Sequence, residues 1–217
     1  MKIEIYSDTI CPWCFIGKRR LERALAERPQ DDLEITWRAF QLNPDMPAEG
    51  MDRQAYLSLK FGGADNARQI YDRVREAGRE EAIPFAFEAI AQTPNTIDSH
   101  RLIRYAEGHG AEIVEAVVQG LFDAYFVEGR NIGERDELVA VAEAAGLEAD
   151  AVRAYLESDE AVAPIRAEDN RARQIGIQGV PTFIFNGKYV LSGAHPPEVL
   201  HQLFDLALQD DGSEAAE

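Results

Sequence analysis

The sequence is poor in cysteine, poor in basic residues and without a long apolar run. Only two of its 217 residues are cysteine, so it is not a small domain held together by several disulfides. Lysine and arginine together number 22, against 39 aspartates and glutamates, which gives a net charge of −17. The basic surface that binds nucleic acid or anionic lipid is therefore missing. No run of about 18 apolar residues is present to span a bilayer.

The rest of the composition is that of an ordinary globular protein. Hydrophobic residues make up 46% of the chain, which is enough for a sizeable buried core. The first residues, MKIEIYSDT, place charges at Lys2, Glu4 and Asp8 among apolar positions. This alternation is typical of a strand and differs from the apolar core of a signal peptide. We therefore expect a cytoplasmic protein that binds neither nucleic acid nor membranes.

The two cysteines, Cys11 and Cys14, form one CxxC motif between a predicted strand and a predicted helix. Residues 2–7 alternate as a strand does, and the apolar residues after the motif recur at helical spacing to about Glu27. Pro12 suits a first helical turn, where its missing N–H group would have no partner. A CxxC motif in this setting favours redox chemistry of the thioredoxin type.

The predicted helix N-terminus makes the two thiols unequal. Cys11 lies at the positive end of the helix dipole, near free backbone N–H groups, and both favour the thiolate that attacks disulfides. Cys14, one turn further along, is shielded and placed to resolve a mixed disulfide. A zinc site is the alternative, because the spacing of His195 and His201 suits a metal-binding pair. These histidines lie near the other end of the chain, so we expect no metal.

Strand patterns return at residues 33–40 and, near the C-terminus, at 182–185 and 188–192. Asn186 and Gly187 separate the last two strands, and Asn-Gly is the preferred pair for a type I′ hairpin turn.

Helical periodicity dominates the middle of the chain, and a further helix is expected over 197–208 with a frayed tail from Gln209. The helices expected in the middle cover about residues 53–62, 64–80, 98–109, 113–126, 134–145, 149–157 and 159–176.

This order of elements predicts an α/β protein with the thioredoxin fold and a large all-helical insertion. The thioredoxin-fold domain is expected to be discontinuous, formed by residues 1–45 and 166–217, with the insertion at 46–165. Pro181 stands just before a strand, where proline is permitted. In a thioredoxin fold this position is a cis-proline that faces the CxxC motif, so we expect a cis bond here and not the ordinary trans bond of a proline that begins a strand.

Four segments of the sequence carry a resemblance to a known family. They are SDTICPWCFIGKRRLE, WRAFQLNPDMPAEG, PNTIDSHRLIRYA and GIQGVPTFIFNGKYVLSGAHP. They resemble the DsbA-like thioredoxin family, and within it the FrnE-type branch. That branch is grouped with 2-hydroxychromene-2-carboxylate isomerases and kappa-class glutathione transferases. The resemblance covers almost the whole chain.

The resemblance implies a role for each residue of the motif and for the proline loop. Cys11 matches the nucleophilic cysteine, Cys14 the resolving cysteine and Pro181 the cis-proline. The backbone of Val180 would pair with an extended substrate.

Pro12 and Trp13 form the dipeptide between the cysteines. DsbA itself resembles this site but has a histidine where Trp13 stands. We therefore expect this chain to be less oxidising than DsbA.

The implied function is a thiol–disulfide oxidoreductase or disulfide isomerase. Its partners would be substrate proteins or small-molecule thiols and disulfides, and relatives include both monomers and homodimers. No cofactor is required, although glutathione can serve as redox partner or cosubstrate.

The main alternative is a glutathione-dependent isomerase or transferase that acts on a small aromatic substrate. These relatives typically have serine in place of the first cysteine, so Cys11 favours the redox function. A scaffold that uses the cysteines as zinc ligands is a third, non-enzymatic hypothesis.

Four other polar residues are weaker candidates. Asn95 could bind a glutathione or peptide group, or simply begin a helix. His195 is expected at the rim of the cleft, near the substrate. Asp8 is most simply a solvated turn residue, and His100 a surface or packing residue.

Overall fold

A four-stranded sheet runs through the centre of the molecule in the order β2-β1-β5-β6. The computed structural model describes residues 1–214, and only the backbone of residues 64–65 and 210–214. β1 (Lys2–Ser7) pairs in parallel with β2 (Glu34–Ala39) and antiparallel with β5 (Thr182–Phe185). β6 (Tyr189–Ser192) completes the other edge. This arrangement is the β-α-β unit and C-terminal hairpin that the sequence predicts.

The hairpin turn has the predicted backbone. Asn186 and Gly187 both have positive φ angles, 49° and 67°, as a type I′ turn requires. Phe185 therefore pairs with Tyr189 across the turn.

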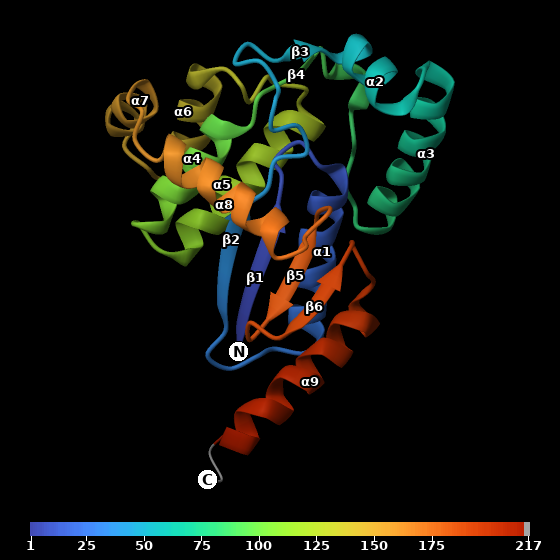
Figure 1. Ribbon diagram of the computed structural model, residues 1–217, viewed down its shortest axis with the longest axis vertical. Coiled ribbons are helices and arrows are strands. Elements are labelled where there is room, and N and C mark those ends of the chain that lie inside the picture. The colour runs from blue at the N-terminus through green and yellow to red at the C-terminus, as the bar shows by residue number, and fades with distance from the viewer. Residues whose placement is uncertain (215–217) are drawn as a thin grey trace.

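Helices cover both faces of the sheet (Figure 1). α1 (Pro12–Glu27) and α9 (Pro197–Glu214) pack against one another on one face, and α8 (Val162–Gln174) crosses the other. Strand alternation divides the side chains between two hydrophobic clusters. Ile3 and Ile5 of β1 join the larger cluster, whereas Tyr6 joins the smaller one beside α8.

The insertion lies at one end of the sheet, beside the start of α1 (Figure 1). Figure 1 shows α2 and α3 on one side and α4 to α7 on the other. The bounds are α2 (Arg53–Phe61), α3 (Ala64–Glu80), η1 (Phe87–Ala89), α4 (Ile97–Glu107), α5 (Ala111–Phe122), η2 (Asp123–Val127), α6 (Arg135–Ala144) and α7 (Ala149–Glu157).

An aromatic cluster joins the insertion to α1. Phe15 of α1 stacks on Phe122 with ring centroids 5.1 Å apart and meets Phe85 edge-on at 5.9 Å. Such pairs add specific geometry to the burial of large apolar surface. The start of α1 is therefore held by both the sheet and the insertion.

Three features differ from the sequence-based expectation. A short two-stranded sheet, β3 (Met51–Asp52) with β4 (Gln92–Thr93), was not predicted. The helix expected over 113–126 ends in the π-helical turn η2. α9 continues through Glu214 instead of fraying from Gln209, and residues 215–217 lie outside the described residues.

The predicted domain boundary at residues 165 and 166 falls inside α8. Among the described residues, no helix is long and apolar enough to cross a bilayer.

Candidate functional site

The CxxC motif forms the first turn of α1, as its position in the sequence predicts. Cys11 is the N-cap residue with extended backbone angles, and Pro12 follows at the first helical position. The backbone N–H of Cys11 donates to Asp8 O at 3.0 Å, and that of Cys14 donates to Cys11 O at 3.0 Å. Both cysteines are free thiols. The helix N-terminus thus presents its unpaired N–H groups and positive dipole end at Cys11.

The two thiols are both buried but differ in their surroundings. Cys11 is 4% exposed and Cys14 is 1% exposed. Burial raises the pKa of the Cys14 thiol well above its usual value, and the adjacent Cys11 raises it further. Hydrogen bonds with the Ser7 side chain and the Asp8 backbone act in the opposite direction and lower that pKa. The Cys14 thiol therefore favours its neutral, protonated form.

The loop before β5 approaches Cys11 directly. The Val180–Pro181 peptide bond is cis, as the topology predicts. The Cys11 thiol donates to Val180 O at 3.5 Å. Gly17 of α1 allows this close approach, because a Cβ built there would lie 2.9 Å from Pro181 Cγ. The structure thus brings Cys11, Cys14, Val180 and Pro181 together.

The two residues between the cysteines lie at the protein surface. Pro12 and Trp13 are both partly exposed, and Trp13 packs its ring against the edge of the main hydrophobic cluster. Trp13 is therefore accessible to a substrate at Cys11.

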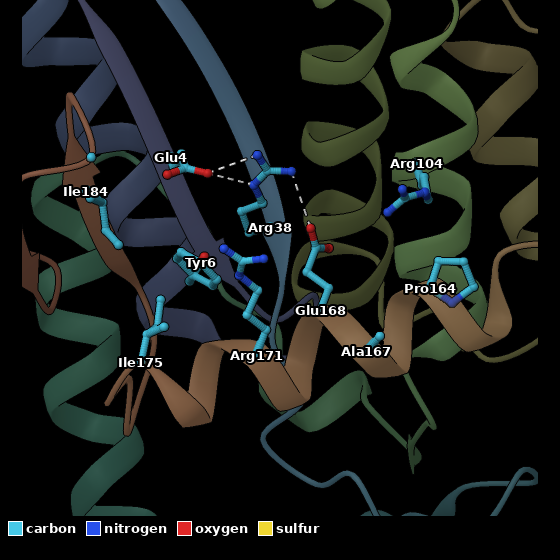
Figure 2. Close-up of a pocket in the computed structure, with 11 residues that line it drawn as sticks. Glu4, Tyr6, Arg38, Arg104, Pro164, Ala167, Glu168, Arg171, Ile175 and Ile184 are labelled. Atoms are coloured by element: carbon cyan, nitrogen blue, oxygen red, sulfur yellow. Dashed lines mark hydrogen bonds and ion pairs between the residues drawn. The ribbon is translucent and has the colours of Figure 1, made fainter.

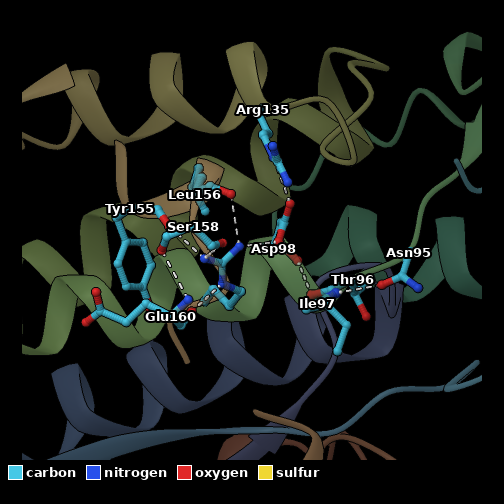
Figure 3. Close-up of polar contacts among 11 residues, drawn as sticks. Asn95, Thr96, Ile97, Asp98, Arg135, Tyr155, Leu156, Ser158 and Glu160 are labelled. Carbon is cyan, nitrogen blue, oxygen red and sulfur yellow. Dashed lines mark hydrogen bonds and ion pairs between the residues drawn. The ribbon is translucent and has the colours of Figure 1, made fainter. Parts of the chain in front are cut away.

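Asn95 is engaged by the protein itself. Its side-chain amide donates to Met46 O at 2.6 Å, and its carbonyl oxygen accepts from Ile97 N at 3.0 Å, at the start of α4 (Figure 3). These contacts are those of a residue that shapes a helix N-terminus.

The ring of His195 bonds to Ser192 O at 3.0 Å, just beyond the end of β6. The neighbouring Gly193 donates its backbone N–H to Pro181 O at 2.7 Å. This segment therefore borders the proline loop. His201 bonds instead to Ala24 O at 3.1 Å. No group of three or more histidine, cysteine or acidic side chains with the geometry of a metal site occurs among the described residues.

Asp8 is not the solvated turn residue that its position suggested. It is fully buried, and its Oδ2 accepts from the backbone N–H of Leu42 at 2.7 Å. Its Oδ1 lies 3.5 Å from Nε2 of His100, which is itself 3% exposed. The Asp8 carboxylate, in the turn before the CxxC motif, and the His100 imidazole, on α4, are therefore buried side by side.

Arg53 is a buried cation that sequence reasoning missed. It is 3% exposed and donates to the hydroxyl groups of Thr93 at 3.1 Å, Tyr125 at 3.3 Å and Tyr71. Within the described part of the chain, no carboxylate lies within ion-pair distance of it. Asp52, which caps α2 by accepting from Ala55 N, fixes the start of the helix that carries Arg53. Buried arginines are usually paired with an anion.

The Arg53 cluster lines a pocket of about 390 Å³, and neither Cys11 nor Cys14 is among the residues that line it. Burial raises the pKa of Tyr71, Arg53 lowers it, and the charge of Cys11 raises it again. The same three influences act on Tyr56.

Arg101, next to His100 on α4, joins α4 to the end of α7. All five of its N–H donors have acceptors. Figure 3 shows the residues that supply these acceptors, among them Asp98, Leu156 and Ser158. The acceptors are Tyr155 O, Ser158 O and Glu160 O at 2.7 Å, Leu156 O at 3.1 Å and Asp98 Oδ1 at 2.7 Å. This is a structural contact with no spare donor.

A larger pocket of about 530 Å³ lies between α8 and the sheet (Figure 2). Arg38 bridges Glu4 at 2.9 Å and Glu168 at 3.4 Å across it. Tyr6 and Ile184 line it from β1 and β5. Cys11 and Cys14 do not line this pocket, which belongs to the face opposite α1.

The sheet order, the cysteine pair at a helix N-terminus and the cis-proline beside it define a thioredoxin-fold protein. The chain matches the DSBA-like thioredoxin domain family over residues 2–205. It therefore belongs to that family, and the predicted thioredoxin fold with a helical insertion is confirmed.

Solved structures agree with this assignment. A probable DsbA oxidoreductase from Streptomyces coelicolor is 32% identical with a TM-score of 0.88, over 96% of this chain and 90% of that one. A 2-hydroxychromene-2-carboxylate isomerase is 19% identical with a TM-score of 0.70, over 100% and 98% of the two chains. The cytosolic disulfide reductase DsbM from Pseudomonas aeruginosa, solved with GSH, is 18% identical with a TM-score of 0.70, over 96% and 100%. The last two show the shared fold alone.

Proposed function

We propose that this chain is a thiol–disulfide oxidoreductase or disulfide isomerase with Cys11 as nucleophile and Cys14 as resolving cysteine. The observation that carries the proposal is the inequality of the two thiols. Cys11 is the N-cap residue of α1, and its thiol donates to the Val180 carbonyl. Cys14 is more deeply buried, and the pKa of its thiol is raised. A nucleophile at a helix N-terminus and a protected second thiol are what disulfide exchange requires.

The proposed reaction has two exchange steps. The Cys11 thiolate attacks a substrate disulfide, so that a Cys11–substrate disulfide forms and one substrate sulfur leaves as a thiolate. The Cys14 sulfur then attacks Cys11, which forms the Cys11–Cys14 disulfide and releases the second substrate sulfur. Two electrons pass from protein to substrate, and isomerisation results when the substrate recaptures Cys11 before Cys14 reacts.

We propose glutathione as the small-molecule thiol partner. Its carboxylates are anions, and Arg53 is a buried cation without a carboxylate partner among the described residues. The related fold of DsbM was solved with GSH. The cytoplasm and the FrnE-type branch remain the expected compartment and branch.

A glutathione-dependent isomerase or transferase is the second candidate, and the 2-hydroxychromene-2-carboxylate isomerase fold supports it. That chemistry would leave the count of protein thiols unchanged during turnover. The presence of Cys11 and the buried Cys14 favours the redox function.

Single serine replacements test the proposal. Cys11→Ser should abolish disulfide reduction in an insulin assay, because the attacking thiolate is gone. Cys14→Ser should instead accumulate a mixed disulfide on Cys11, visible by mass spectrometry under non-reducing conditions. Retention of most redox activity in Cys11→Ser would disprove the proposed function. Glutathione-dependent turnover of an aromatic substrate at constant thiol count would establish the second candidate.

A further inference from the structure

The pocket between α8 and the sheet has the dimensions of a small-molecule site. Its volume is about 530 Å³, and β1, β2, β5, α4 and α8 all contribute side chains to its lining (Figure 2). Pockets that bind small organic ligands have volumes of about 300–1,000 Å³. Cys11 and Cys14 are not among the lining residues, so the exchange reaction at the start of α1 does not use this pocket.

The sheet side of the pocket is apolar. Tyr6 of β1 and Ile184 of β5 are 6% and 8% exposed, and both belong to the smaller hydrophobic cluster. Ile175, just beyond α8, adds an apolar side chain that is 55% exposed. Covering such a side chain removes apolar surface from water, which is favourable. The pocket can therefore hold the aromatic or aliphatic body of a ligand.

The hydroxyl group of Tyr6 is a polar group that the protein leaves unused. It makes no hydrogen bond to any described residue, although the side chain is more than nine-tenths buried. Buried polar groups are rarely left without a partner. Burial raises the pKa of Tyr6 and the Glu4 carboxylate raises it further, whereas Arg38 and Arg171 lower it. The hydroxyl therefore keeps its proton at neutral pH and can donate it to a ligand in the pocket.

Three arginines line the pocket, and they differ in their contacts. Arg38 of β2 is held between Glu4 at 2.9 Å and Glu168 at 3.4 Å. Arg104 of α4 and Arg171 of α8 make no ion pair or hydrogen bond within the part of the chain that the structure describes. Figure 2 shows these two arginines on either side of Glu168. Both are exposed, so an anion can reach them without any opening of the protein.

The acidic residues of the pocket do not neutralise its arginines. Glu4 and Glu168 both pair with Arg38, and Glu168 also accepts from Ala39 N at 3.0 Å. The lining therefore keeps one positive charge in excess, on a chain whose net charge is −17. A local charge opposite in sign to that of the whole protein favours an anion at this one place. One excess charge matches a ligand with a single negative charge.

We propose that this pocket binds a small organic acid with one carboxylate and an apolar body. The carboxylate accepts hydrogen bonds from Arg171 and from the Tyr6 hydroxyl, and Arg104 adds a second positive charge. A guanidinium group presents paired N–H donors that fit the two oxygens of a carboxylate. The apolar body covers Ile175 and Ile184. This binding site is separate from the CxxC motif, and the inference does not depend on the proposed redox function.

The test uses 2-naphthoate as the probe and the uncharged 2-naphthamide as its matched compound, with titration calorimetry of the full chain. Arg171→Gln removes the charge of one exposed side chain, and Tyr6→Phe removes only a hydroxyl group. Arg166→Gln is the control variant. Arg166 also lies on α8, is exposed and has no ion pair with a described residue, but it does not line the pocket.

We expect 2-naphthoate to bind about 10-fold or more tightly than 2-naphthamide, because only the acid forms charge-assisted hydrogen bonds. Arg171→Gln should weaken the binding of 2-naphthoate about 10-fold, which is the lower end of the range for such a bond because the group is exposed. Tyr6→Phe should weaken it by about 2- to 10-fold, as for a neutral hydrogen bond. Arg166→Gln should match the wild type.

Methyl NMR of isoleucine-labelled protein locates the probe. The signals of Ile175 and Ile184 should shift when 2-naphthoate is added, whereas that of Ile10, the residue before the CxxC motif, should not. Shifts at Ile10 alone would place the probe at the cysteines and would overturn the proposal. So would the absence of saturable binding, or full affinity for 2-naphthoate in both Arg171→Gln and Tyr6→Phe.

Discussion

His100 and Arg101 are neighbours on α4, and both are buried, yet their polar surroundings differ. Arg101 places each of its five N–H groups on an acceptor at the end of α7 or on Asp98. His100 faces Asp8 at 3.5 Å, and each of the two has an atom without a hydrogen bond. A fully satisfied cluster stabilises one geometry, whereas a partly satisfied one costs stability. One turn of helix thus carries a fully bonded buried side chain next to a partly bonded one.

The comparison predicts that substitutions of Arg101 and His100 lower the free energy of unfolding by different amounts. Arg101→Met should lower the free energy of unfolding by about 3–5 kcal/mol, because it strands buried carbonyls and Asp98. His100→Gln should cost less stability, because the His100 ring has a single polar contact, to Asp8 at 3.5 Å. Urea unfolding of the two variants measures both losses.

Arg135→Met is the matched control for the arginine, since Arg135 is about half exposed and pairs with the same Asp98 at 3.3 Å. It should cost less than about 1 kcal/mol. Equal losses of stability in Arg101→Met and Arg135→Met would contradict the structural role given to Arg101.

A substitution that crowds the loop containing Pro181 tests how that loop affects Cys11. Gly17→Ala places a Cβ 2.9 Å from Pro181 Cγ and 3.2 Å from a ring atom of Phe183. Overpacking of this kind costs about 1–3 kcal/mol, offset by up to about 1 kcal/mol of helix propensity. Because the loop must shift from Cys11, formation of a mixed disulfide between Cys11 and glutathione should slow.

Gly108→Ala serves as its control, because a Cβ there comes no closer than 3.6 Å to the Tyr105 carbonyl oxygen. Rapid-mixing rates and melting curves of both variants test the point. A Gly17→Ala protein with wild-type adduct formation would show that the loop position does not set the reactivity of Cys11.

The buried state of Cys14 also predicts how stability changes with pH. Its pKa is raised in the folded chain, so from about pH 8.5 upward the unfolded chain loses this proton while the folded chain retains it. The contribution of the buried Cys14 thiol to stability should therefore be fully present below pH 8.5. Above that pH the free energy of unfolding should fall by up to about 1.4 kcal/mol per pH unit. Cys14→Ala should flatten this loss between pH 8.5 and 10, measured by urea unfolding in reductant. Identical slopes in the two proteins would mean that Cys14 titrates normally.

The smallest expected effect comes from the mouth of the site. Trp13→His adds a group that can donate towards the Cys11 thiolate and so stabilises the reduced form. A gain of about 0.3–1 kcal/mol corresponds to a rise in reduction potential of up to about 20 mV. Equilibration with a glutathione buffer measures it.

Local patterns predicted the fold and the cysteine site from the sequence. The CxxC motif followed a period-two segment and preceded a helical one, and the structure has β1 and α1 there. Asn186-Gly187 encodes its own turn, because both residues tolerate positive φ. Both features depend on neighbours in the chain, so no long-range contact was needed to find them.

The buried charges could not be found in this way. Asp8 looked like an ordinary turn residue, and its burial depends on Leu42 and on His100, which are distant in sequence. Arg53 lies at the start of an amphipathic helix, and its surroundings come from Tyr71, Thr93 and Tyr125. Only tertiary packing shows which charged residues leave solvent.

The small β3–β4 sheet has a consequence for how such a chain can vary. Met51 pairs with Thr93, and Arg53 N donates to Ala91 O at 2.9 Å, so the arm that carries α2 and α3 begins and ends at adjacent points. Closing a longer or shorter arm over the same base costs only about 0.6 kcal/mol for each doubling of its length. The arm is therefore a module that can be exchanged for one of another length, changing what reaches the thiols without moving them.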